Sequence, residues 1–121
     1  MASRVARELD ICHVFANELA VCDGRMTGEV AINVSIDDPA RTKGAIVRQL
    51  KQALKATTGE TWAVGDNWGD IEMLQEAGRA FLVAPRPQCR EQAAQAAPHV
   101  ECIPDLCHLV SLIREVSVRA D

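Results

Sequence analysis

The sequence has no long apolar run. Its longest uninterrupted apolar stretches are about five residues, far short of the roughly 20 that a transmembrane helix requires. Residues 1–4 lead into a charged helical pattern rather than into the apolar core of a signal peptide. We therefore expect no membrane partner and a cytoplasmic location.

The sequence also has no cluster of basic residues. Its 13 Lys and Arg residues stand against 17 Asp and Glu residues, which gives a net charge of −4, and the basic residues are scattered along the chain. Proteins that bind nucleic acid gather such residues into a patch that neutralises phosphates. The composition therefore excludes nucleic acid as an expected partner.

Paired cysteines are missing as well. The chain has an odd number of cysteines without a repeated spacing, namely Cys12, Cys22, Cys89, Cys102 and Cys107. We expect reduced thiols, since a chain of this size can bury a core without disulfides. Four side chains of the types that bind zinc do lie within ten residues: His99, Cys102, Cys107 and His108. Because the pattern around them predicts a strand and then a helix, they would diverge, so we favour ordinary core cysteines over a structural zinc site.

What is present is an apolar content of 48% in 121 residues, enough for the core of one domain, which we assign to residues 1–121. The first part predicts a helix at residues 2–9, whose beginning we expect before Met1, and a buried strand at 13–16. A β-hairpin is expected at residues 18–32, because Asp23-Gly24 between two apolar runs is a strong turn signal. A helix follows over residues 42–57, with Gly59 at its end.

From residue 61 on, strands and helices alternate. The apolar spacing predicts strands at 61–65, 80–83 and 99–103, and helices at 71–78, 88–97 and 105–116. Such alternation is typical of an α/β fold with a parallel sheet and right-handed crossovers. We find no internal repeat and no linker.

One segment carries chemistry: Asp66 and Asp70 in the run from Val64 to Leu74. Ligands of parallel α/β sheets bind beyond the carboxyl ends of the strands, and Asp66 is expected where its strand ends. Asp70, four residues later, opens the next helix, so both carboxylates can face one crevice and suit Mg²⁺. Glycines 65 and 69 would let the backbone turn tightly beside the ion. The alternative is that Asp70 is only a helix cap and Asp66 a turn residue.

The run from Gly65 to Leu74, Gly-Asp-Asn-Trp-Gly-Asp-Ile-Glu-Met-Leu, resembles the fourth motif of haloacid dehalogenase-like hydrolases. The stretch from Phe15 to Val30 and the pair Lys43-Gly44 resemble the region before and at the third motif of phosphoserine phosphatase-like members. The resemblance implies a Rossmann-like three-layer fold, and in this chain we expect its parallel sheet to have about four strands. It further implies that Asp66 and Asp70 help to hold Mg²⁺ and that Lys43 neutralises charge around a phosphorylated small molecule.

The chain departs from the family pattern in three places. No Asp-x-Asp, the nucleophile and acid–base pair of the family, occurs in the 121 residues. The Ser or Thr of the second motif is also missing, since Ser3 is expected inside a helix, and Gly69 stands where relatives usually have Asn. We therefore expect an incomplete domain in which residues 13–16 pair with residues 61–65, within a homodimer that buries the open sheet edge.

Two functions follow. The first is part of a Mg²⁺-dependent phosphomonoester hydrolase, inactive as this isolated chain, whether it is a truncated enzyme or a natural short protein. The second is a non-catalytic α/β module that binds an ion or small anion or associates with itself; Trp68 would then fill the substrate space rather than anchor the loop half-buried. A response-regulator role for Asp66 is disfavoured, because no lysine follows Lys55.

Overall fold

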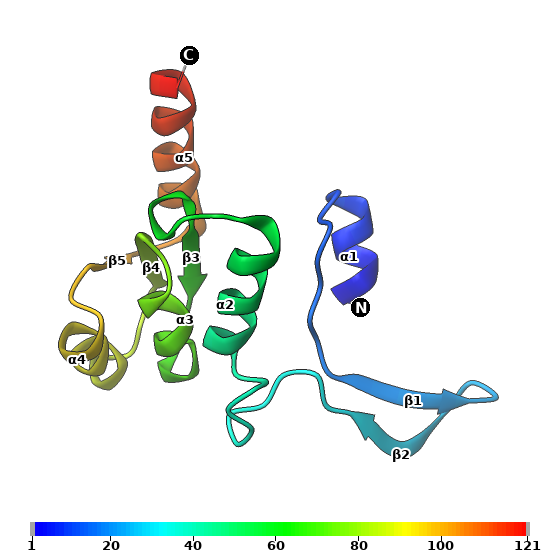
Figure 1. The fold of residues 1–121 in the computed structure, drawn as a ribbon. Coiled ribbons are helices and arrows are strands. Elements are labelled where there is room, and N and C mark those ends of the chain that lie inside the picture. The colour runs from blue at the N-terminus through cyan, green and yellow to red at the C-terminus, as the bar shows by residue number, and fades with distance from the viewer. Residues whose placement is uncertain (1, 121) are drawn as a thin grey trace. The chain divides into compact units, whose positions relative to one another are not determined.

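The computed structural model describes the backbone of residues 2–120 and the side chains of residues 2–116 (Figure 1). The chain divides into two compact units. The first runs from Met1 to Thr42 and the second from Lys43 to Asp121.

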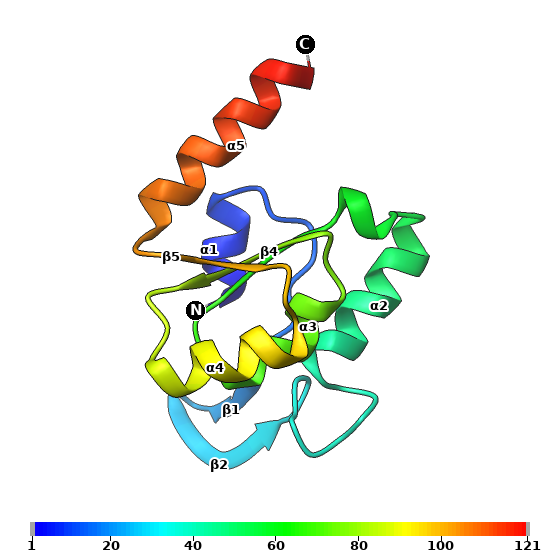
Figure 2. The ribbon, with the colours of Figure 1, turned by 90° about the vertical axis from the view of Figure 1, so that its left-hand side faces the viewer.

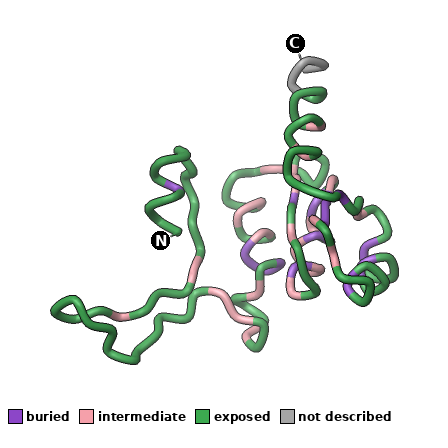
Figure 3. Tube along the Cα trace, turned by 180° about the vertical axis from the view of Figure 1, so that it is seen from behind, coloured by how far each residue is buried: buried purple, intermediate pink, exposed green. Residues whose placement is uncertain are grey.

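The first unit consists of a short helix and a hairpin. Helix α1 spans Ala2–Glu8, and strands β1 (Glu18–Cys22) and β2 (Arg25–Ala31) pair antiparallel. Asp23 and Gly24 form the turn with φ values of 52° and 77°, the left-handed pair that a two-residue hairpin requires. The predicted hairpin is confirmed. Almost all of its residues are exposed on both faces, as the green trace in Figure 3 shows.

The second unit is built around a parallel sheet. Its elements are α2 (Lys43–Leu54), the 3₁₀ turn η1 (Thr58–Glu60), β3 (Trp62–Gly65), η2 (Trp68–Asp70), α3 (Ile71–Gln75), β4 (Arg79–Val83), α4 (Pro87–Ala96), β5 (Val100–Ile103) and α5 (Leu106–Ala120). The strands lie in the order β3-β4-β5, all parallel. The predicted α/β class, with a parallel sheet flanked by helices and a separate hairpin, is confirmed.

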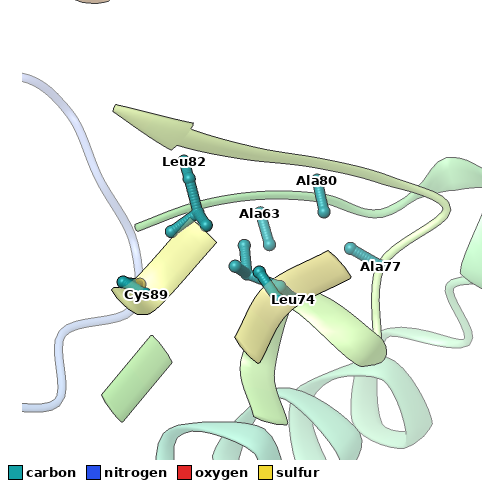
Figure 4. Packing of buried hydrophobic residues seen from close by; sticks show 7 residues of the cluster. Ala63, Leu74, Ala77, Ala80, Leu82 and Cys89 are labelled. Carbon is teal, nitrogen blue, oxygen red and sulfur yellow. The ribbon is translucent and has the colours of Figure 1, made fainter. Parts of the chain in front are cut away.

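One face of this sheet carries the core. The side chains of Ala63, Ala80 and Leu82 alternate onto the face where α3 and α4 pack. Leu74 of α3 and Cys89 of α4 meet them there, and the residues of this cluster converge in Figure 4. Figure 2 shows α3 and α4 along this side of the sheet and α5 running away from the end of β5. The small residues of the strands let both helices approach closely.

The predicted strand at residues 13–16 is wrong. These residues have no strand pairing, and the sheet therefore has three strands among the described residues rather than about four. The segment is instead tied to the base of the hairpin, since Asn33 Nδ2 donates to the Ala16 carbonyl over 2.8 Å. Asn17 Oδ1 in turn accepts from the amides of Asn33 and Val34. A short apolar run forms a strand only where another strand supplies backbone partners.

The end of α2 also differs from the prediction. The helix stops at Leu54 rather than near Gly59, because Lys55 adopts a left-handed φ of 54°. The amides of Lys55 and Ala56 then bond back to the carbonyls of Gln52 and Lys51, the hydrogen-bond pattern of a Schellman cap. Glycine is preferred at that position but is not required. Because Lys55 takes the place of a glycine, no signal in the sequence marked the end of the helix there.

The cysteines are mostly not part of the core. Cys89 is buried, whereas the other four, Cys12, Cys22, Cys102 and Cys107, are exposed. The expectation that Cys102 and Cys107 are ordinary core cysteines is therefore wrong, and Cys89, for which no such expectation was made, is the buried one. Within the described residues, no helix combines the length and the apolar character that crossing a membrane would require.

Candidate active site

The candidate site lies where β3 ends and α3 begins. Asp66 directly follows β3, at the carboxyl edge of the sheet, as predicted. The 3₁₀ turn η2 then reverses the chain and brings Asp70 back beside the end of the strand. Asn67 starts this turn, and its side chain accepts a hydrogen bond from the Gly69 amide over 2.9 Å. The loop is thus closed by its own polar residues.

Asp70 is the buried carboxylate of the site, with a side-chain exposure of 3%. Its Oδ2 accepts hydrogen bonds from the Asp66 amide over 2.9 Å and from the Asn67 amide over 3.3 Å. Its Oδ1 accepts from the ammonium group of Lys43. Burial alone would raise the pKa of Asp70, but the hydrogen bond from Lys43 and those from the two amides together hold this pKa below its ordinary value.

Lys43 is the first residue of α2 and reaches Asp70 from a different element. Its side chain is 46% exposed, so the ammonium group meets both the buried carboxylate and solvent. A cation in the first turn of a helix opposes the helix dipole, and the pairing with Asp70 offsets that cost. Asp66, by contrast, is exposed. The structure therefore gathers all three predicted residues, since Lys43 and the Asp66 backbone contact the same carboxylate.

The glycines of the loop have a different role from the one predicted. Neither Gly65 nor Gly69 has a positive φ, so tight turning is not the reason for them. A Cβ atom on Gly65 would lie only 2.5 Å from the Cβ of Asp70, whereas one on Gly69 would meet Asn67 Oδ1 at 3.2 Å. Gly65 is thus needed because the Asp70 side chain packs directly on the end of β3.

A set of ion pairs beside the site was not predicted from the sequence. Arg48 of α2 donates to Glu72 Oε1 over 3.0 Å and to Glu76 Oε1 over 2.7 Å, and both glutamates belong to the α3 segment. These two carboxylates raise the pKa of Arg48, Glu76 more than Glu72. The signal was available, because basic residues recur on one face of the helix at 42–57 and Glu72 and Glu76 recur four residues apart.

Of the oxygen ligands at the candidate site, one is suited to Mg²⁺. Mg²⁺ is bound by one or two carboxylates together with water and phosphate oxygens, and the exposed Asp66 is such a carboxylate. Asp70 already has partners on both oxygens. No buried side-chain nitrogen or oxygen in the described part of the chain lacks a partner, and no group of three potential ligands gathers there. The residues fit an ion held mainly through Asp66 and solvent.

Trp68 lies between the two aspartates and is 61% exposed. The interpretation that it anchors the loop half-buried is therefore wrong. An indole with this exposure contributes little to the core. Packing in the core therefore does not explain why a tryptophan stands in the loop.

Comparison with known proteins gives a family and several relatives. Residues 1–75 match the family model of haloacid dehalogenase-like hydrolases. The chain is 35% identical over 95 residues to phosphoserine phosphatase SerB2 of Mycobacterium tuberculosis, covering 78% of this chain and 22% of the relative. It is 31% identical over 121 residues to the phosphoserine phosphatase of Lactococcus lactis, covering all of this chain and 51% of the relative.

Solved structures give the same relationship. A phospho-aspartyl intermediate analogue of phosphoserine phosphatase superimposes with a TM-score of 0.73 and 28% identity, covering 92% of this chain and 50% of that one. A substrate-bound phosphoserine phosphatase complex superimposes with a TM-score of 0.72. The chain thus spans about half or less of the length of these relatives.

Proposed function

Because the chain belongs to the haloacid dehalogenase-like hydrolase family, we propose that it supplies the ion-binding and charge-stabilising side of a phosphomonoester hydrolase site and is inactive by itself. The observation that carries this proposal is the joint contact of Lys43 and the Asp66 backbone with the buried carboxylate of Asp70. The named relatives are phosphoserine phosphatases, which supports a phosphomonoester as the substrate class.

In this proposal Lys43 neutralises negative charge on the phosphoryl group. An ammonium group has three N–H donors, so pairing with one Asp70 oxygen does not exhaust it. Asp70 holds Lys43 in place, and its contacts with the loop amides fix where Asp66 leaves the strand. Bound Mg²⁺ would supply charge stabilisation for the transferred phosphoryl group. Asp66 would be its main protein ligand.

The proposed inactivity rests on the chemistry that the chain does not contain. Phosphomonoester hydrolysis through a covalent intermediate needs a nucleophile, and the 121 residues have no Asp-x-Asp. Ser3, the one residue of the right type near the start, lies in α1. The residues of such a site act as a unit, so the remaining residues cannot replace a missing nucleophile.

The ion-binding part is tested by Mg²⁺ titration of the ¹⁵N-labelled chain by NMR. We expect saturable shifts of the Asp66 and Asn67 amides, and an affinity weaker by more than about tenfold in Asp66→Asn. Asp23→Asn in the hairpin turn is the matched control and should bind as the parent does. Equal affinity of the parent and Asp66→Asn would contradict the assignment of Asp66.

The inactivity is tested with a generic aryl phosphate in the presence of Mg²⁺. We expect no turnover above buffer. Turnover that depends on Mg²⁺ and disappears in Asp66→Asn would overturn this part of the proposal.

A second candidate, self-association, is favoured by the hairpin. Partner residues of antiparallel strands share a face, and Leu19 pairs with Val30 while Val21 pairs with Met26. All four are between 46% and 70% exposed, so the hairpin presents two open apolar cross-strand pairs, on either side of the register shift between Leu19 and Val21. Sedimentation velocity at rising concentration tests this. A dimer that Leu19→Glu dissociates, and that Glu18→Gln on the other face leaves intact, would support it; a monomer throughout would reject it.

A further inference from the structure

The contact between α2 and α3 is unusually close beside the site. A Cβ atom on Gly44 would lie 2.4 Å from Cγ of Glu72 and 2.7 Å from its Cδ, closer than such atoms approach. Gly44 directly follows Lys43, and Glu72 is two residues after Asp70. The two helices therefore touch at the point where they deliver the two members of the ion pair.

Arg48 holds Glu72 in this contact. Its guanidinium donates to Glu72 over 3.0 Å, and its other terminal nitrogen donates to Glu76 over 2.7 Å, one helical turn further along. A planar guanidinium that bridges two carboxylates is held in orientation as well as in distance. Arg48 thus fixes both the spacing and the rotation of α3 against α2.

A second cation closes the far end of the same contact. Lys51 Nζ donates to the Glu76 carbonyl over 2.8 Å and to Thr58 Oγ1 over 2.9 Å, and its side chain is only 17% exposed. One basic face of α2 thereby binds side chains and the last turn of α3. Single exposed ion pairs contribute little to stability. This set therefore matters more for the geometry of the contact between α2 and α3 than for the free energy of unfolding.

We propose that Glu72, clamped between Gly44 and Arg48, is a positioning residue that sets the distance at which Lys43 meets Asp70. This inference deepens the proposed function, because it concerns the charge-stabilising pair of that site. Glu72 does not contact the ammonium group of Lys43. It acts through the separation of α2 and α3, and a side chain of another shape or charge would let the ion pair open.

The test is hydrogen exchange of the ion-free 121-residue chain. The Asp66 and Asn67 amides, which donate to Asp70, report on the site, and the Leu82 amide in the central strand reports on global opening. In Arg48→Met we expect exchange of the first two amides to accelerate by about tenfold relative to the third, the factor that corresponds to the loss of one modest hydrogen bond. Arg90→Met, an exposed arginine of α4, is the control and should leave the ratio unchanged.

Two further variants keep the test decisive. Glu72→Gln retains the shape of the side chain and loses its charge, so it should accelerate the same amides even where Arg48→Met fails to fold. Arg48→Lys restores the charge without the second terminal nitrogen of the guanidinium and should restore only part of the protection. Equal acceleration of all three amides in both Arg48→Met and Glu72→Gln would show a merely structural role and would overturn the inference.

The outcomes for the two proposals are distinguishable. Because exchange is measured without Mg²⁺ and without substrate, a failed Mg²⁺ titration leaves this result standing. Conversely, normal Mg²⁺ binding by Asp66 together with unchanged exchange ratios would reject the positioning role and keep the ion site.

Discussion

The two units of the chain differ in whether their apolar side chains are buried or exposed. In the second unit, β4 and α3 bury Phe81, Leu82 and Leu74 completely. In the first, Ala6 is the one buried residue among those described, and the hairpin exposes its apolar side chains. The second unit therefore carries its own hydrophobic core, and the first is held by a turn and by local hydrogen bonds.

The difference explains where the candidate site can be ordered. A carboxylate that is buried beside a lysine needs a rigid frame, because its partners must be fixed before the charge is desolvated. Asp70 has such a frame in the end of β3 and in the contact between α2 and α3. The hairpin offers no comparable frame, and no residue of the candidate site lies on it.

The largest effect is expected from removing a core side chain. Leu74→Ala should cost roughly 2–5 kcal/mol of unfolding free energy, because Leu74 has no exposed surface and its loss leaves a cavity. Leu19→Ala in the hairpin should cost less than about 0.5 kcal/mol, since that side chain is 59% exposed. Urea unfolding followed by circular dichroism measures both. Equal losses would mean that the hairpin packs in solution as tightly as the core.

An intermediate effect is expected at the buried carboxylate. Asp70→Asn should cost about 1.5–3 kcal/mol, the contribution of a hydrogen bond to a charged group, because it removes the charge that Lys43 and the loop amides bind. Asp23→Asn makes the same chemical change in the hairpin turn. It should be nearly neutral, since asparagine tolerates the left-handed φ of 52° found there.

Asp70→Asn also tests the direction in which the stability of the chain changes with pH. The pKa of Asp70 is lowered in the folded chain, so its stabilisation is fully present above the unfolded value of about 3.9 and is lost as the pH falls through the lower folded value. Asp70→Asn should therefore flatten the loss of stability below about pH 4. Some slope should remain, because the backbone hydrogen bond from Thr57 also lowers the pKa of Glu60. An unchanged slope would contradict the role of Asp70.

Local signals predicted much of this architecture. The Asp23-Gly24 turn and the alternating pattern after residue 61 identified the hairpin and the parallel sheet, because turn chemistry and apolar periodicity act over a few residues. The strand expected at residues 13–16 was wrong, because pairing depends on a partner far along the chain. The end of α2 was misplaced since Lys55 adopts a conformation that usually selects glycine.

The members of the candidate site were proposed from the sequence, and their contacts were not predictable from it. Asp66 and Asp70 were proposed from their place after a strand and from the resemblance to the fourth motif, and Lys43 from the resemblance to the third. Spacing does not reveal that both Asp70 oxygens have protein partners, or that Gly65 is required by the side chain of Asp70. These facts arise from the packing of three elements against one another, which no short sequence window contains.

A smaller and local effect is expected from Gly24→Ala, which tests the independence of the two units. A Cβ atom there meets nothing within 4 Å, but the φ of 77° makes alanine unfavourable by roughly 1 kcal/mol. The cost should fall on the hairpin alone, seen as weaker cross-strand NOEs between Val21 and Met26. The urea midpoint of the second unit should not move. A shift of that midpoint would mean that the hairpin stabilises the frame of Asp70, and the separation of the two units would then fail.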